Sequence, residues 1–168
     1  MPNLNLAAKK YAEENGYAFI PLGLRHELAT AGIVYAASKV PEPDEVYVAI
    51  STGVLSRALQ IAWPKAQFYC VAVARNLKAG ELGRAQVISD RLPFTSPETM
   101  IPPFPTVATY DAKVWKYIPK QSGRNILMWN VGTEPTLQDE TIYDKIDSYR
   151  DWKKKDESSS RNTLHSYI

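Results

Sequence analysis

One stretch constrains the fold of this chain more than any other, residues 45–64 with the sequence EVYVAISTGVLSRALQIAWP. It begins with an apolar run rich in β-branched residues at 46–50, which is typical of a buried strand. A small polar turn follows at 51–53, and an apolar pattern with helical spacing comes after it. Where such a strand leads into a helix in an open α/β sheet, N–H groups at the helix start point outward with the positive end of the helix dipole. The stretch therefore predicts a site for a phosphate or carboxylate group.

Strand and helix patterns alternate on both sides of this stretch, and short connections join them. The predicted elements are helix 4–15, strand 17–22, helix 27–40, strand 46–50, helix 54–62 and strand 67–74. Such alternation with short connections favours a parallel sheet with helices on both faces. We therefore expect an α/β fold, a Rossmann-like three-layer α/β/α arrangement with a mostly parallel sheet.

The later part of the chain is less regular. Residues 93–105 contain five prolines and predict an irregular loop. The other predicted elements are a strand at 86–89, a short helix at 110–118 and a buried strand at 125–131. From residue 139 the sequence is charged and lacks apolar periodicity. We expect one α/β domain over residues 1–138 and a partly disordered charged extension over residues 139–168.

The composition limits the kinds of binding partner and the cellular compartment that we expect. A formal net charge of +2 in 168 residues does not indicate nucleic acid or an anionic membrane as a partner. Cys70 is the one cysteine, so an internal disulfide is excluded, and its place in a strand pattern predicts a buried, unreactive thiol. The sequence has neither a secretory leader pattern nor a stretch of transmembrane length. We expect a cytoplasmic protein that has no membrane partner.

Three side chains outside the turn are candidates for chemistry. Arg57 lies one helical turn beyond it and could add charge to a bound phosphate, although a solvated helix arginine fits equally well. His26, at the start of the second helix, is either a proton carrier or anion contact facing the same edge or a surface residue. Lys113, in the segment YDAK at 110–113, either supplies an amine or phosphate contact or lies on an exposed helix face. The sequence contains no catalytic triad pattern and no cluster of metal ligands.

Several motifs, taken in order, resemble a known enzyme family. The segments are GYAFIPLG at 16–23, DEVYVAISTGVLSR at 44–57 and AQFYCVAV at 66–73. They resemble the later half of fold-type II pyridoxal-phosphate-dependent enzymes, the group of tryptophan synthase β, cysteine synthase and aminocyclopropane-carboxylate deaminase. The short phage-type members are more similar still, in the turn at 51–55 and in the segments AWP at 62–64, YDAK at 110–113 and WNVG at 129–132.

The resemblance implies a cofactor and its binding residues. In these enzymes a turn of this kind cradles the phosphate of pyridoxal phosphate with backbone N–H groups. Carried onto this chain, the turn consists of Ser51, Thr52, Gly53, Val54 and Leu55. The cofactor-binding lysine of the family lies in an earlier segment, which has no counterpart here. The resemblance therefore implies a pyridoxal-phosphate-related enzyme of lyase or transferase type, or half of one, acting on an amino acid or amine-bearing substrate.

Partners and alternative functions follow from the missing segment. The lysine could come from a separately encoded half, or Lys113 could replace it, and a homo-oligomer is also compatible. A phosphoribosyltransferase-like enzyme would use a similar phosphate site, but Ala49 and Ile50 stand where such enzymes carry an acidic pair. The third alternative is a non-catalytic binding or assembly protein on the same frame. The partner that we expect is a small phosphate-bearing ligand.

Overall fold

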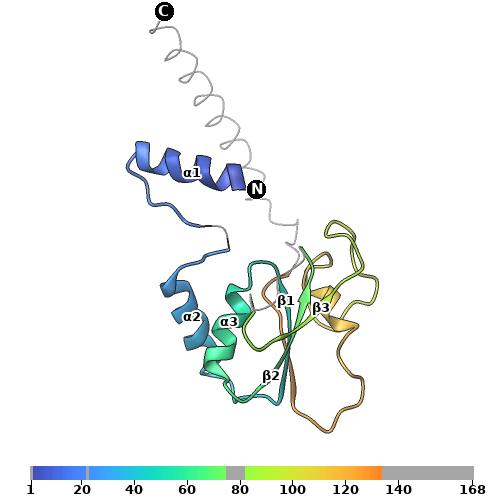
Figure 1. The fold of residues 1–168 in the computed structure, drawn as a ribbon. Helices are drawn as coiled ribbons and strands as arrows, with labels where there is room; N and C mark the ends of the chain where they lie inside the picture. Colours follow the sequence, from blue (N-terminus) through green and yellow to red (C-terminus); the bar gives the residue numbers. More distant parts are fainter. Residues whose placement is uncertain (1, 22, 75–81, 134–168) are drawn as a thin grey trace, which may run out of the picture. The chain divides into compact units, whose positions relative to one another are not determined.

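The computed structural model describes residues 2–21, 23–74 and 82–133, which all fall in one compact unit, Met1–Glu134 (Figure 1). The predicted extension at 139–168 lies outside the described residues. In chain order the elements are α1 (Pro2–Glu14), α2 (Glu27–Ala37), β1 (Glu45–Ile50), α3 (Val54–Ala62), β2 (Gln67–Ala72), β3 (Gln86–Ser89), α4 (Ala112–Trp115) and β4 (Ile126–Trp129). No helix in these ranges is both long enough and apolar enough to span a membrane.

The four strands form one parallel sheet in the order β3-β2-β1-β4. β1 pairs with β2 along its whole length and with β4 on its other side, where Glu45 is opposite Ile126. Because every pair is parallel, all four carboxyl ends lie at the same edge of the sheet, where ligands bind in open α/β folds. The predicted α/β, Rossmann-like fold with a parallel sheet is confirmed.

Helices cover both faces of this sheet (Figure 1). Val46 packs with Leu59 of α3 on one face, and α2 contributes Ala37 to the same cluster. On the opposite face, Tyr47 packs with Val114 of α4. All six residues of β1 are buried, and burial on both faces explains the continuous apolar run at 46–50 that follows Glu45.

Contacts at the amino-terminal edge fix β4 beside β1. The Asn125 N–H donates to the Asp44 carboxylate at 2.8 Å, and the Asp44 N–H donates to the Asn125 carbonyl at 2.9 Å. Arg124 pairs with the buried Glu45 carboxylate at 2.8 Å, and the Tyr47 hydroxyl donates to the same carboxylate at 3.3 Å. Burial and the charge of Glu45 raise the pKa of Tyr47 to about 12, so its hydroxyl keeps its proton and remains a donor.

A buried polar network joins α3 to β2 and to the segment before β3. The Ser56 hydroxyl lies 3.0 Å from the Cys70 sulfur, and Gln60 donates to Ser56 at 3.0 Å and to the Leu82 carbonyl at 2.7 Å. The Gln60 side-chain oxygen accepts from the Arg84 N–H at 3.0 Å. Burial raises the pKa of Cys70 to about 11, so the thiol stays protonated and unreactive at neutral pH. The cysteine is buried, as its strand pattern predicts.

The guanidinium of Arg84 closes the carboxyl end of α3. It donates to the carbonyls of Gln60 at 3.2 Å, Trp63 at 2.6 Å and Ala66 at 3.4 Å, and it lies over the Phe68 ring at 5.2 Å. The last carbonyls of a helix have no partners within the helix, so a cationic donor at this position satisfies them.

The strand predicted at 17–22 is wrong. Residues 17–21 form no strand, and the Tyr17 N–H instead donates to the Ala12 carbonyl at the end of α1 at 2.8 Å. β1 already has a neighbour on each side, and Pro21 has no N–H to give to a ladder.

The other predicted elements are present, and four of them have shorter bounds than predicted. α2 ends at Ala37 rather than at residue 40, and β2 ends at Ala72 rather than at residue 74. The helix predicted at 110–118 is the four-residue α4, and the strand predicted at 125–131 is the four-residue β4. The proline-rich segment 93–105 is irregular, as predicted.

Candidate ligand-binding site

A cavity of about 600 Å³ opens at the carboxyl edge of the sheet. The ends of β1 and β4, one side of α2 and the turn between β1 and α3 line it. Its volume lies within the range of roughly 300–1,000 Å³ that is usual for small-ligand sites. The lining residues are largely apolar: Gly23, Leu24, Ala29, Gly32, Ile33, Ala36, Ala49, Ile50, the turn residues 51–55, Tyr110, Trp129, Asn130 and Val131.

The predicted phosphate turn, residues 51–55, lines this cavity along its whole length. Gly53 has a φ of +78° and is the residue before the first turn of α3. A side chain is unfavourable in this left-handed conformation, which lets the chain pass from strand to helix within three residues. The first N–H groups of α3 lack acceptors within the helix and lie at the positive end of its dipole. The fold therefore places the start of a helix, with its N–H groups, at the wall of an apolar cavity.

The loop before α2 packs directly on this turn. Gly23 has a φ of +71°, and a Cβ atom built there would lie 2.4 Å from side-chain atoms of Thr52. The Arg25 guanidinium donates to the Thr52 carbonyl at 3.4 Å. The sequence predicts neither contact, although a glycine just before a helix is the kind of signal that indicates close backbone approach.

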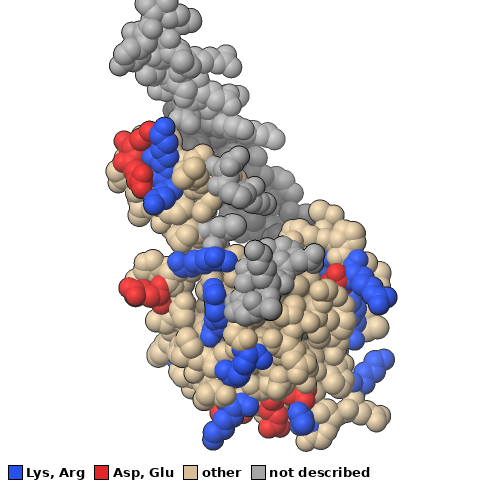
Figure 2. All heavy atoms as spheres, viewed as in Figure 1, with Lys and Arg blue, Asp and Glu red and all other residues tan. Residues whose placement is uncertain are grey.

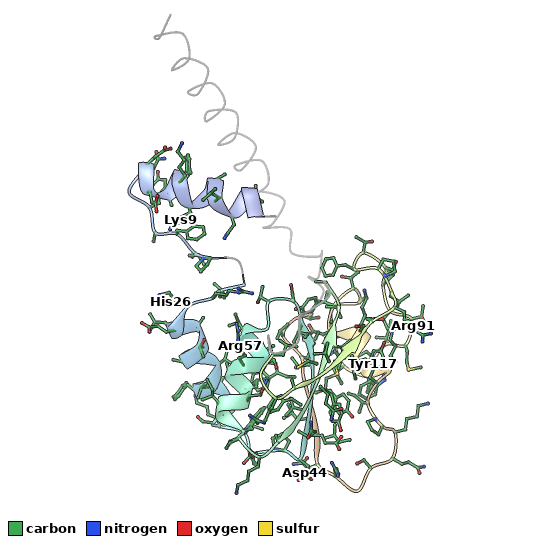
Figure 3. The ribbon with its side chains drawn as sticks, viewed as in Figure 1. Lys9, His26, Asp44, Arg57, Arg91 and Tyr117 are labelled. Carbon is green, nitrogen blue, oxygen red and sulfur yellow. The ribbon has the colours of Figure 1, made fainter. Side chains whose placement is uncertain are left out.

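His26 and Arg57 lie on the outer side of the turn. They line a smaller hollow of about 350 Å³, which shares Val54 with the main cavity. In Figure 3, His26 stands at the start of α2 and Arg57 projects from α3. The His26 Nδ1 accepts the Leu28 N–H at 3.1 Å, so His26 caps α2. Figure 2 shows separate basic side chains over the region of α2 and α3, a setting that favours an anion.

Lys113 is fully buried and does not line the cavity. Its ammonium donates to the carbonyls of Pro93 at 2.7 Å and Phe94 at 3.3 Å. The structure therefore places this amine of α4 against the loop that follows β3 and does not bring it to the turn at 51–55.

A second lysine of the same segment holds the ends of that loop. The Lys116 ammonium pairs with Asp90 at 2.9 Å and with Glu98 at 2.7 Å. Burial lowers the pKa of Lys116, but the hydrogen bonds to Glu98 and Asp90 outweigh it and raise that pKa above its usual value. Lys113 and Lys116 together fix the loop at 90–98.

Tyr110 and Asp111 bring polar groups to the cavity region from the other face of the sheet. Tyr110 lines the cavity, and its ring meets the Phe94 ring edge-on at a centroid distance of 6.4 Å. Asp111 is fully buried, and neither carboxylate oxygen forms a well-aligned hydrogen bond with a described residue, although the Val131 and Gly132 N–H groups lie close enough to stabilise its charge. Burial raises the pKa of Asp111 to about 6, against the opposing effect of the Val131 and Gly132 N–H groups. The sequence singles out this segment for its lysine, whereas the structure brings its tyrosine to the site.

Within residues 2–21, 23–74 and 82–133, no group of three or more His, Cys, Asp or Glu side chains could hold a metal ion. No protein-family model matches the chain, and comparison with curated proteins and with solved structures finds no similar protein. The likeness to fold-type II pyridoxal-phosphate enzymes therefore stays a prediction from the sequence motifs.

Proposed function

We propose that this protein binds a small phosphate-bearing ligand at the carboxyl edge of its sheet, and that pyridoxal phosphate is that ligand. The observation that carries the proposal is the cavity of about 600 Å³ whose wall includes the whole turn at 51–55 and the start of α3. The N–H groups of a helix start and an apolar wall lie in one cavity, which suits a phosphate attached to a flat ring. The motif resemblance in the sequence selects pyridoxal phosphate from the ligands of this kind.

In the proposed complex the phosphate accepts hydrogen bonds from N–H groups of residues 51–55. The ring lies against the apolar wall, where Ile33 of α2 and Trp129 of β4 provide most of the bulk. The loop at 23–25, packed on Thr52, closes one side of the turn. When bound, pyridoxal phosphate supplies electron-withdrawing chemistry for reactions at the α-carbon of an amino acid, and the protein supplies binding and orientation.

The cavity lining contains no lysine among the described residues. A covalent link to the ligand would need an amine, and the Lys113 amine is held by two loop carbonyls. We therefore favour a phosphate-binding half of a pyridoxal-phosphate enzyme of lyase or transferase type, with the lysine coming from a partner.

The test is a titration of the full chain with pyridoxal phosphate, followed by absorbance and calorimetry. Borohydride reduction and peptide mapping then show whether any lysine is linked to the ligand. We expect saturable binding with no lysine trapped, whereas the absence of binding would overturn the proposal. Trapping of Lys113 would overturn its assignment as a loop anchor.

Thr52→Asp tests the turn itself. A carboxylate at this position repels the phosphate, so we expect the affinity for pyridoxal phosphate to fall by about tenfold or more. Ser122→Asp is the matched control, because it adds the same charge to an exposed position at the amino-terminal end of β4. Equal losses in both variants would show a general charge effect and would count against the turn.

A further inference from the structure

Beyond the turn, two residues bring a hydroxyl or an amide group to the cavity wall, Tyr110 and Asn130. The Asn130 amide is already engaged within the protein. Its N–H donates to the Pro105 carbonyl at 2.8 Å, and its oxygen accepts from the Thr106 hydroxyl at 3.1 Å. Burial and the charge of Asp111 act on the Tyr110 hydroxyl, but no hydrogen bond from a described residue does. Tyr110 is therefore the wall residue with a donor left for a ligand.

The ring of Tyr110 is held in place by a chain of contacts. It packs edge-on against Phe94, and the Phe94 carbonyl accepts from the buried ammonium of Lys113 at 3.3 Å. Lys116 fixes both ends of the same loop through Asp90 and Glu98. A donor held by fixed neighbours loses little conformational entropy when a ligand binds.

Electrostatics decide which kind of group this hydroxyl can bind. Burial and the charge of Asp111 raise the pKa of Tyr110 to about 12, so the phenol is a neutral donor at physiological pH. The same negative charge opposes a phosphate dianion beside Tyr110. An oxygen on the ring of the ligand is the better partner, while the phosphate occupies the turn.

We propose that Tyr110 determines ligand specificity by donating a hydrogen bond to an oxygen carried on the ring of the phosphate-bearing ligand. This inference rests on the proposed function, because it requires a ligand in the cavity. It goes further in naming the ligand class: a ring with both a phosphate arm and an oxygen substituent binds, and the same ring without the oxygen binds more weakly.

The test compares two probes on the full chain, pyridoxal phosphate and benzyl phosphate, which has an aromatic ring on a phosphate arm but no oxygen substituent on that ring. For Tyr110→Phe we expect calorimetry to give an affinity for pyridoxal phosphate about fivefold to tenfold lower than in the unmodified chain. The affinity for benzyl phosphate stays within about twofold, because no hydrogen bond is lost there.

Tyr117→Phe is the matched control. Tyr117, labelled in Figure 3, packs against the same cluster as Tyr110 but does not line the cavity. Its substitution removes the same atom and should change neither affinity, and thermal unfolding of both variants verifies the fold. If Tyr110→Phe lowered the affinities for both probes equally, or lowered neither, the role of Tyr110 would be overturned while the proposed function would stand. Failure of the unmodified chain to bind either probe would overturn the proposed function, and this inference with it.

Discussion

Asp111 is the described acidic residue whose environment departs most from water. Its carboxylate is fully buried and neither oxygen forms a well-aligned hydrogen bond with a described residue, so burial shifts its protonation equilibrium toward the neutral form. The pKa rises from 3.8 to about 6 on folding. Because the folded state holds its proton more tightly, the stabilising contribution of this group is complete below pH 4 and is lost as the pH rises through 6.

Asp111→Asn should remove this pH dependence. A pKa shift of this size changes the free energy of unfolding by about 3 kcal/mol between pH 4 and pH 7.5. We expect the free energy of unfolding of the unmodified chain to fall relative to that of the variant over this range, by up to about 3 kcal/mol. Urea unfolding of both proteins at a series of pH values measures it. Parallel pH profiles for the two proteins would contradict the prediction.

For single residues, the sequence predicts the turn at 51–55 but not the positions of the other candidate residues. The turn at 51–55 is local, since one strand, one glycine and one helix determine its course. The position of Lys113 depends on carbonyls twenty residues away in a proline-rich loop, which no local pattern places. The exposure of Tyr110 to the cavity depends in the same way on Phe94.

Among the elements, α3 is held at its carboxyl end by three hydrogen bonds from the Arg84 guanidinium. Arg84→Met removes the donors to three backbone carbonyls of the α3 end and its following turn while keeping an apolar chain over Phe68. We expect the free energy of unfolding to fall by about 1–3 kcal/mol, as measured by chemical denaturation.

Arg91→Met provides the control for this substitution. Arg91 lies in an exposed loop (Figure 3), so the same change of residue type should alter the free energy of unfolding by no more than about 0.5 kcal/mol. Equal effects of the two substitutions would show that the Arg84 contacts contribute nothing specific.

Strands were predictable where burial on both faces leaves a continuous apolar run, as in β1 and β2. The segment at 17–22 has the same apolar character, but pairing requires a free edge as well as a suitable sequence. The outer edges of β3 and β4 are unpaired among the described residues, so a lack of edges does not exclude the segment. Pro21, which cannot donate to a ladder, is the local feature against a strand there.

For the molecule as a whole, we expect local stability against unfolding to be highest in β1 and lower in β3 and α1. β1 is buried throughout and hydrogen-bonded on both sides, whereas β3 is an edge strand with mostly exposed side chains. In α1, Leu4, Leu6 and Tyr11 are 72%, 70% and 59% exposed. A helix of this length with little burial is marginal in water.

Hydrogen–deuterium exchange by mass spectrometry should follow this gradient. We expect amides of β1 to exchange most slowly, those of β3 faster, and those of α1 at least about tenfold faster than those of β1. Protection of α1 equal to that of β1 would mean that its apolar side chains are covered in solution, for instance by a second copy of the chain.

The pairing of β1 with β4 also sets the order in which the protein can be completed during synthesis. Asp44 and Asn125, which join the two strands, are 81 positions apart. Until the ribosome has delivered β4, one edge of β1 is unpaired, and exposed strand edges promote association with other chains. Trp129 and Asn130, which form part of the cavity wall, arrive at the same late stage. A nascent chain therefore completes the wall of this cavity and pairs the second side of β1 in one event.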